Sequence, residues 1–131
     1  MKKHAFDSRL VRMLFGNYGK TESRGMENRI KAIIAELKKK LEDLYGSRLK
    51  QLIVYGSYAR GQQTDDSDID IAVVLDGDIS QSSEISRMVG AITDLNLEYS
   101  VLISVYPVST ADYSSVNSPL MINLRREGVP V

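Results

Sequence analysis

A pair of aspartates separated by one residue is the feature of this sequence most able to support chemistry. Asp68 and Asp70 begin a predicted strand, Asp68–Leu75. Successive side chains of a strand point to opposite faces, so the two carboxylates share one face, about 6.6–6.8 Å apart along the chain. Two like charges on one face repel each other. A divalent cation would compensate them, and Mg²⁺ suits hard oxygen ligands and completes its shell with water and substrate phosphates.

A second polar cluster precedes the aspartates. Gly56 and Ser57 follow an apolar run and are separated from Asp68 by ten residues. Glycine lets the backbone approach a ligand closely, and free N–H groups at the start of a helical turn can hold an anion. Arg60 is the only Lys or Arg near this segment and is either a surface charge or a phosphate contact. A phosphate-binding turn beside a carboxylate pair is typical of transfer from a metal-bound nucleoside triphosphate.

The surrounding sequence supplies the elements that would position these residues. Apolar residues recur at helical spacing from Ile30 to Leu44, and Gly46 follows as a stop signal. The remaining patterns predict strands over Leu49–Tyr55, Asp68–Leu75 and 97–108, and helices over Ser82–Leu95 and Pro119–Arg126. Helices alternating with a few strands indicate an α/β (α+β) domain, a small mixed sheet flanked by helices. We expect residues 1–25 to form an N-terminal extension and linker, and residues 26–131 to form the domain.

Composition excludes several classes of protein. The 131-residue chain has no cysteine and a single histidine, which removes disulfide scaffolds, thiolate nucleophiles and Cys-based zinc sites and argues against a Ser-His-Asp triad. No apolar run approaches the roughly 20 residues of a membrane span, and the start of the chain turns polar too soon for a signal peptide. We therefore expect a cytoplasmic protein without a membrane partner.

Charge is unevenly distributed although the net charge is zero. Residues 1–50 hold 13 Lys and Arg against 6 Asp and Glu, and residues 51–131 hold 4 against 11. One interpretation is a solvated basic helix beside an acidic sheet. The other is a basic face for a polyanion and an acidic centre for a metal ion. Charge alone does not decide between them, and nucleic acid is not indicated as a partner.

The spacing of these residues resembles a known family signature. Gly56-Ser57, ten residues and then Asp68-Ile69-Asp70 are similar to the G-S-x10-D-x-D pattern of the DNA polymerase β-like nucleotidyltransferase superfamily. The short chain resembles its minimal nucleotidyltransferase (MNT) branch, whose members are encoded beside HEPN proteins. The resemblance covers roughly residues 26–128.

The resemblance implies a role for each motif residue. Gly56 and Ser57 would hold the triphosphate of a nucleotide such as ATP, and Asp68 and Asp70 would bind Mg²⁺. The implied reaction transfers a nucleoside monophosphate, AMP in the MNT branch, to a hydroxyl and releases pyrophosphate. The implied biological role is that of an antitoxin which binds and modifies a HEPN ribonuclease toxin, in a homo- or hetero-oligomer.

One expected acid is missing. Members of the superfamily usually carry a third carboxylate on a neighbouring strand, and the pattern places it at Ser100 in this chain. Glu98, two residues earlier on the same predicted strand, is the candidate substitute, although a solvated residue at a helix–strand junction explains it as well. Two alternative functions therefore stay open: an inactive fold that neutralises a partner by binding alone, and a transferase acting on a small molecule of the aminoglycoside type.

Overall fold

The computed structural model of the chain describes residues 21–64 and 66–131, with side chains from residue 28 onward. Its first helix is α2 (Thr21–Tyr45), followed by a short 3-10 turn, η1 (Gly46–Arg48). The predicted helix is therefore confirmed, but it begins inside the segment expected to be a linker. The rest of the predicted N-terminal extension lies outside the described residues.

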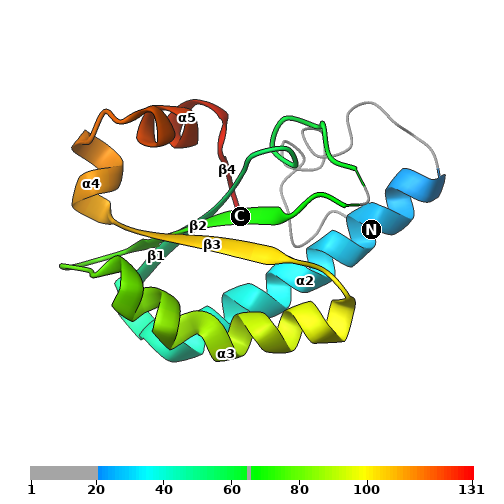
Figure 1. Cartoon of the computed structure of the whole chain (residues 1–131), viewed down its shortest axis with the longest axis horizontal. Helices are drawn as coiled ribbons and strands as arrows, with labels where there is room; N and C mark the ends of the chain where they lie inside the picture. The colour runs from blue at the N-terminus through cyan, green and yellow to red at the C-terminus, as the bar shows by residue number, and fades with distance from the viewer. Residues whose placement is uncertain (1–20, 65) are drawn as a thin grey trace.

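Four strands form one mixed sheet in the order β3-β2-β1-β4 (Figure 1). β1 (Leu49–Tyr55) pairs antiparallel with β2 (Ile69–Leu75), and β2 pairs parallel with β3 (Ile103–Ser109). A parallel pair needs a crossover connection, which α3 (Gln81–Tyr99) supplies. The two-residue strand β4 (Val129–Pro130) pairs antiparallel with the outer side of β1. The predicted small mixed sheet is thus confirmed.

Helices cover both faces of this sheet. Figure 1 shows α2 and α3 on one face and the short helices α4 (Thr110–Ser115) and α5 (Pro119–Glu127) on the other. The larger core lies between the sheet and α2 and α3, where alternate residues of β2 meet the apolar stripe of α2: Ile30, Ile33, Ile34, Leu37, Leu41, Ile69, Ile71, Val73 and Leu75. The smaller core lies under α4 and α5 and contains Ile53, Ala72, Val74, Val108, Met121 and Leu124.

The connection between α3 and β3 differs from the sequence prediction. The helix continues to Tyr99 and ends at Ser100, which has a left-handed backbone with φ of 53°. The strand then begins at Ile103 rather than near residue 97. The Asn96 side chain accepts a hydrogen bond from the Ile103 N–H and so joins the end of the helix to the start of the strand. A serine at the helix end gives a weaker stop signal than glycine, which explains the wrong boundary.

Two further elements were not predicted. The helix α4 has six residues and the strand β4 has two, and segments this short carry too few periods to be read from sequence. None of the helices in the described part of the chain is both long and apolar enough to cross a bilayer.

Candidate functional site

The chain leaves β1 through a compact turn that is anchored in the larger core. The Arg60 N–H donates to the Gly56 carbonyl at 3.1 Å, which closes one helical turn, and the Gln62 N–H donates to the Ser57 carbonyl at 2.9 Å. Tyr58 and Ala59 point inward and are buried in the core. Because the inner residues fix the turn, Ser57 and Arg60 are held on its outer side.

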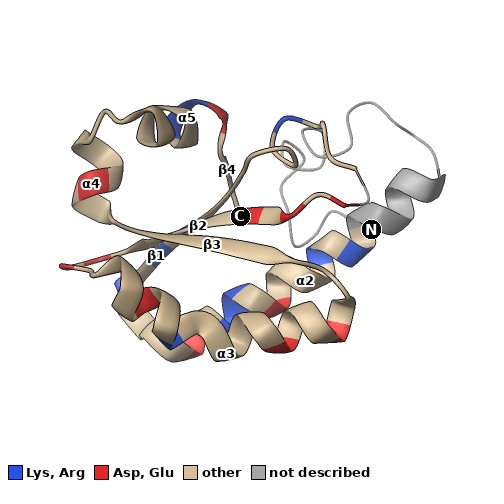
Figure 2. Ribbon diagram, viewed as in Figure 1, with Lys and Arg blue, Asp and Glu red and all other residues tan. Residues whose placement is uncertain are grey.

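The two aspartates lie at the start of β2: Asp70 is its second residue, and Asp68 immediately precedes the strand, which begins one residue later than predicted. Asp68 and Asp70 are partly exposed, whereas Ile69 between them is buried in the larger core. Asp70 is the register partner of Tyr55, the last residue of β1. The carboxylates therefore lie at the end of the sheet where the turn after β1 begins, on the face that α4 and α5 cover only in part. Figure 2 shows acidic residues at the start of β2 and a basic residue in the turn that precedes it.

The turn lies directly against Asp70 of the acid pair. Gly56 has a φ of +75°, and a Cβ atom built on it would lie 2.3 Å from Oδ2 of Asp70. A side chain at this position would force the Asp70 carboxylate to shift, so glycine is favoured here for two reasons, the left-handed backbone and the close approach of that carboxylate. Residues that are distant in sequence thus form one site.

The surroundings of Asp70 disfavour its charged form. Burial raises the pKa of Asp70 above its usual value and the neighbouring charge of Asp68 raises it further, while the Arg60 guanidinium lowers it. Burial also raises the pKa of Tyr55, with further contributions from Asp70 and Tyr106. A cation bound between Asp68 and Asp70 would favour the ionised form of both carboxylates, and it would therefore offset the cost of keeping Asp70 charged.

The residue beside Asp70 on the neighbouring strand is Ser104, a position that the sequence analysis missed. The parallel register of β2 and β3 pairs Asp70 with Ser104, and paired residues of adjacent strands point to the same face. The predicted position of the third acid at Ser100 is wrong, because Ser100 caps α3. Glu98 is wrong as its substitute, because it lies on the exposed surface of α3 and on no strand.

The donor set at this site is two carboxylates. Within residues 28–64 and 66–131 no group of three or more His, Cys, Asp or Glu side chains is placed to hold a metal ion. Mg²⁺ is commonly bound by one or two carboxylates together with water and substrate phosphates, so Asp68 and Asp70 fit that cation. Two carboxylates are too few to form the all-protein oxygen site that Ca²⁺ prefers.

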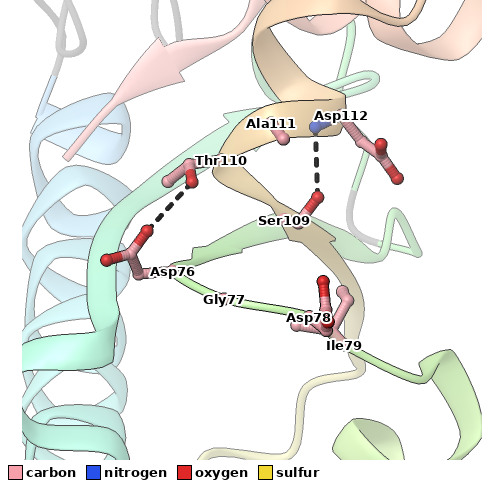
Figure 3. Close-up of a pocket in the computed structure, with 8 residues that line it drawn as sticks. All are labelled: Asp76, Gly77, Asp78, Ile79, Ser109, Thr110, Ala111 and Asp112. Carbon is pink, nitrogen blue, oxygen red and sulfur yellow. Dashed lines mark hydrogen bonds between the residues drawn. The ribbon is translucent and has the colours of Figure 1, made fainter.

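A second group of acids lies at the opposite end of β2. A cavity of about 490 Å³ is lined there by the turn after β2 and by the start of α4: Asp76, Gly77, Asp78, Ile79, Ser109, Thr110, Ala111 and Asp112 (Figure 3). The Thr110 hydroxyl donates to Oδ1 of Asp76 at 3.2 Å. The Ser109 hydroxyl accepts from the Asp112 N–H at 3.1 Å and so caps α4. These polar groups mainly satisfy the turn and the helix end.

Comparison with known proteins identifies the class to which this fold and site belong. The sequence profile of a family described as "Nucleotidyltransferase domain" matches residues 34–113. That match includes the turn after β1, the aspartate pair and Ser104. The chain therefore belongs to the nucleotidyltransferase domain family.

Individual relatives agree with this assignment. The chain is 35% identical over 103 residues to the protein named "Putative protein adenylyltransferase MJ0604" of Methanocaldococcus jannaschii, covering 78% of this chain and 93% of that protein. It is 51% identical over 47 residues to "Putative protein adenylyltransferase MJ1379" of the same organism, covering 36% of this chain and 45% of that one. A crystal structure of a mutant of the toxin–antitoxin pair MntA-HpeT has the same fold, with a TM-score of 0.51 and 19% identity over 71% of this chain and 68% of that chain.

Proposed function

We propose that this protein is a Mg²⁺-dependent adenylyltransferase that transfers AMP from ATP to a hydroxyl group of a partner protein. The contact between Gly56 and Asp70 is the observation that carries the proposal. It joins a turn able to bind phosphate to a carboxylate pair able to bind a cation, and a metal-bound triphosphate requires both at once. The names of the relatives support the adenylyl group as the one transferred.

The chemistry assigns a task to each residue of the site. Ser57 and the N–H groups at the start of the turn would contact the β- and γ-phosphates, and Arg60 would neutralise part of their charge. Asp68 and Asp70 would hold Mg²⁺, which would reduce the repulsion between the phosphates and the attacking oxygen. The acceptor oxygen forms a bond to the α-phosphorus, the bond to the bridging oxygen of pyrophosphate breaks, and the acceptor proton passes to solvent.

The acceptor that we propose is a HEPN-type toxin, which would make this chain its antitoxin. The fold match to one chain of a toxin–antitoxin pair supports this role. The described residues form a single sheet with its covering helices, and none of these elements forms a separate acceptor-binding domain. A hydroxyl presented by another protein is therefore the simplest substrate.

The test uses ATP labelled at either the α- or the γ-phosphate. The purified protein is incubated with Mg²⁺ and the product of the neighbouring gene, and label on protein is counted. We expect transfer from α-labelled ATP only, and a loss of at least about a hundredfold in Asp70→Asn, because the cation site is broken. Asp76→Asn, at the other end of β2, is the matched control and should transfer normally. Transfer from the γ-phosphate, or full activity of Asp70→Asn, would contradict the proposal.

A second candidate function follows from Ser104. A serine beside Asp70 cannot bind a cation or accept a proton as a carboxylate does, which favours an antitoxin that neutralises its partner by binding without modifying it. The same variants separate the two functions. Neutralisation that persists in Asp70→Asn, together with no label transfer by the unaltered protein, would favour binding alone.

A further inference from the structure

The arginine of the turn is paired with an acid from the far end of the chain. Nη1 of Arg60 lies 4.0 Å from Oε1 of Glu127, and both side chains are nearly half exposed, at 46% and 44%. Nε of the same guanidinium donates to Oε1 of Gln62 at 3.1 Å. Arg60 is therefore held from two sides, by its own turn and by the last residue of α5.

The fold brings Glu127 to this place through β4. Val129 pairs with Val54 on the outer side of β1, and Glu127, the last residue of α5, precedes this strand by two residues. Gly128 makes the approach possible, because a Cβ atom at this position would lie 2.4 Å from Cγ2 of Ile53. The turn after β1 thus has Asp70 on one side and Glu127 on the other.

Arg60 interacts with both of these acids. Its ion pair joins it to Glu127, and its charge lowers the pKa of Asp70. If Asp70 holds a cation, its negative charge is already neutralised, and Glu127 becomes the main competitor for the guanidinium. Phosphate oxygens entering the turn would need the same guanidinium and would have to replace the Glu127 carboxylate.

We infer that Glu127 is a positioning residue that holds Arg60 beside the turn and competes with the nucleotide phosphates for it. The inference rests on the proposed function, since it assumes that the turn binds a nucleotide. An ion pair between two exposed side chains contributes little free energy, so phosphates can displace Glu127. Its carboxylate then lowers nucleotide affinity, because it occupies the Arg60 guanidinium while the site is empty.

The test is a double-mutant cycle read by calorimetry with a non-hydrolysable ATP analogue and Mg²⁺ at low ionic strength. We expect Glu127→Gln to tighten binding about two- to fivefold, the range of an exposed ion pair, and to lower KM for ATP without raising kcat. In an Arg60→Gln background the same change should have no effect. Glu42→Gln removes an exposed acid from α2 and is the matched control, with unchanged affinity.

Three results would overturn the inference, and they bear differently on the proposed function. Unchanged or weaker binding in Glu127→Gln contradicts it and leaves the proposed function intact. Tighter binding that persists in the Arg60→Gln background also contradicts it, because Glu127 would then repel the phosphates directly. No binding of the analogue by the unaltered protein overturns both the inference and the proposed function.

Discussion

The two ends of β2 both carry acids, but they differ in what surrounds them. At the start of the strand, the charge of Asp68 acts on Asp70, and the Asp70 carboxylate lies close to Gly56 of the preceding turn. At its far end, Asp76 and Asp78 follow the strand and line a cavity with residues of α4. Figure 2 shows acidic residues at both ends, so the presence of negative charge does not distinguish them.

The difference lies in how each acid is satisfied. The Asp76 backbone bonds to Arg48 on both sides, with its N–H donating to the Arg48 carbonyl at 2.8 Å and its carbonyl accepting from Nε of Arg48 at 3.2 Å. Its side chain accepts from Thr110. Asp70 is instead partly buried beside another acid, which raises its pKa. The Asp76 carboxylate is thus satisfied by a hydrogen bond, whereas the Asp70 carboxylate bears a cost that a bound cation would remove.

Replacing a glycine by alanine at each end of β2 should give the largest difference between the two ends in stability and in nucleotide binding. Gly56 and Gly77 both have positive φ, +75° and +87°, but a Cβ atom at Gly77 would meet nothing within 4 Å. We expect Gly77→Ala to cost about 1–2 kcal/mol from the backbone alone. Gly56→Ala should cost about 2–5 kcal/mol, because overpacking against Asp70 is added, and should abolish nucleotide binding. Thermal unfolding and calorimetry measure the two effects, and equal losses at the two positions would show that the contact with Asp70 is unimportant.

Adding an acid beside Asp70 should increase the affinity for Mg²⁺ at the start of β2. Ser104→Asp would place a third carboxylate beside Asp70, and we expect about tenfold tighter Mg²⁺ binding, since affinity rises with the number of charged ligands. Ser100→Asp is the matched control, because it adds the same charge at the end of α3 and should change nothing. The measurement is the rise in melting temperature during a Mg²⁺ titration. A gain from Ser100→Asp, or none from Ser104→Asp, would contradict the register described above.

The smallest effect concerns stability in the absence of metal. Because the pKa of Asp70 is raised above 3.8 by burial and by Asp68, the folded protein binds this proton more tightly than the unfolded chain. The resulting stability is present at acid pH and is lost as the pH rises through the raised pKa. We expect Asp70→Asn to melt about 2–4 °C above the unaltered protein at pH 7 in EDTA, a gain of about 0.5–1 kcal/mol.

That gain should disappear as the pH falls toward 3.8, since the unaltered protein is then protonated as well. Asp76→Asn should show no gain at any pH, because it weakens the hydrogen bond from Thr110. Melting temperatures followed by circular dichroism across the pH range provide the comparison. A lower melting temperature for Asp70→Asn at neutral pH would mean that this acid is structural, like Asp76.

The elements at the start of β2 could be predicted from sequence because the signals for them are local. The apolar run from Ile69 to Leu75 marks the strand that carries Asp70, and Gly56 marks a turn after an apolar run. The stripe of α2 and the buried run of β2 gave the larger core for the same reason. One exception is Leu44, which was counted in the stripe but is 41% exposed, because the buried residue at the end of α2 is Tyr45.

The neighbours of Asp70 could not be predicted, because they depend on register between strands. Ser104 is beside Asp70 only because β3 starts at Ile103 and pairs with Ile69. The predicted end of α3 was four residues too early, so the start of β3 and its register could not be deduced. Glu127 reaches the turn through a two-residue strand that no periodicity reveals. The sequence contained one usable signal for each, the polar Ser104 inside an apolar strand and the glycine at 128.

The most direct test of the central claim is Mg²⁺-dependent binding of a non-hydrolysable ATP analogue, measured by calorimetry on the unaltered protein, Asp70→Asn and Asp76→Asn. We predict that the unaltered protein and Asp76→Asn bind the analogue more tightly with Mg²⁺ than with EDTA, and that Asp70→Asn loses this difference. Equal binding by all three proteins, or a loss confined to Asp76→Asn, would contradict the claim that the acids at the start of β2 and the turn after β1 form the nucleotide site.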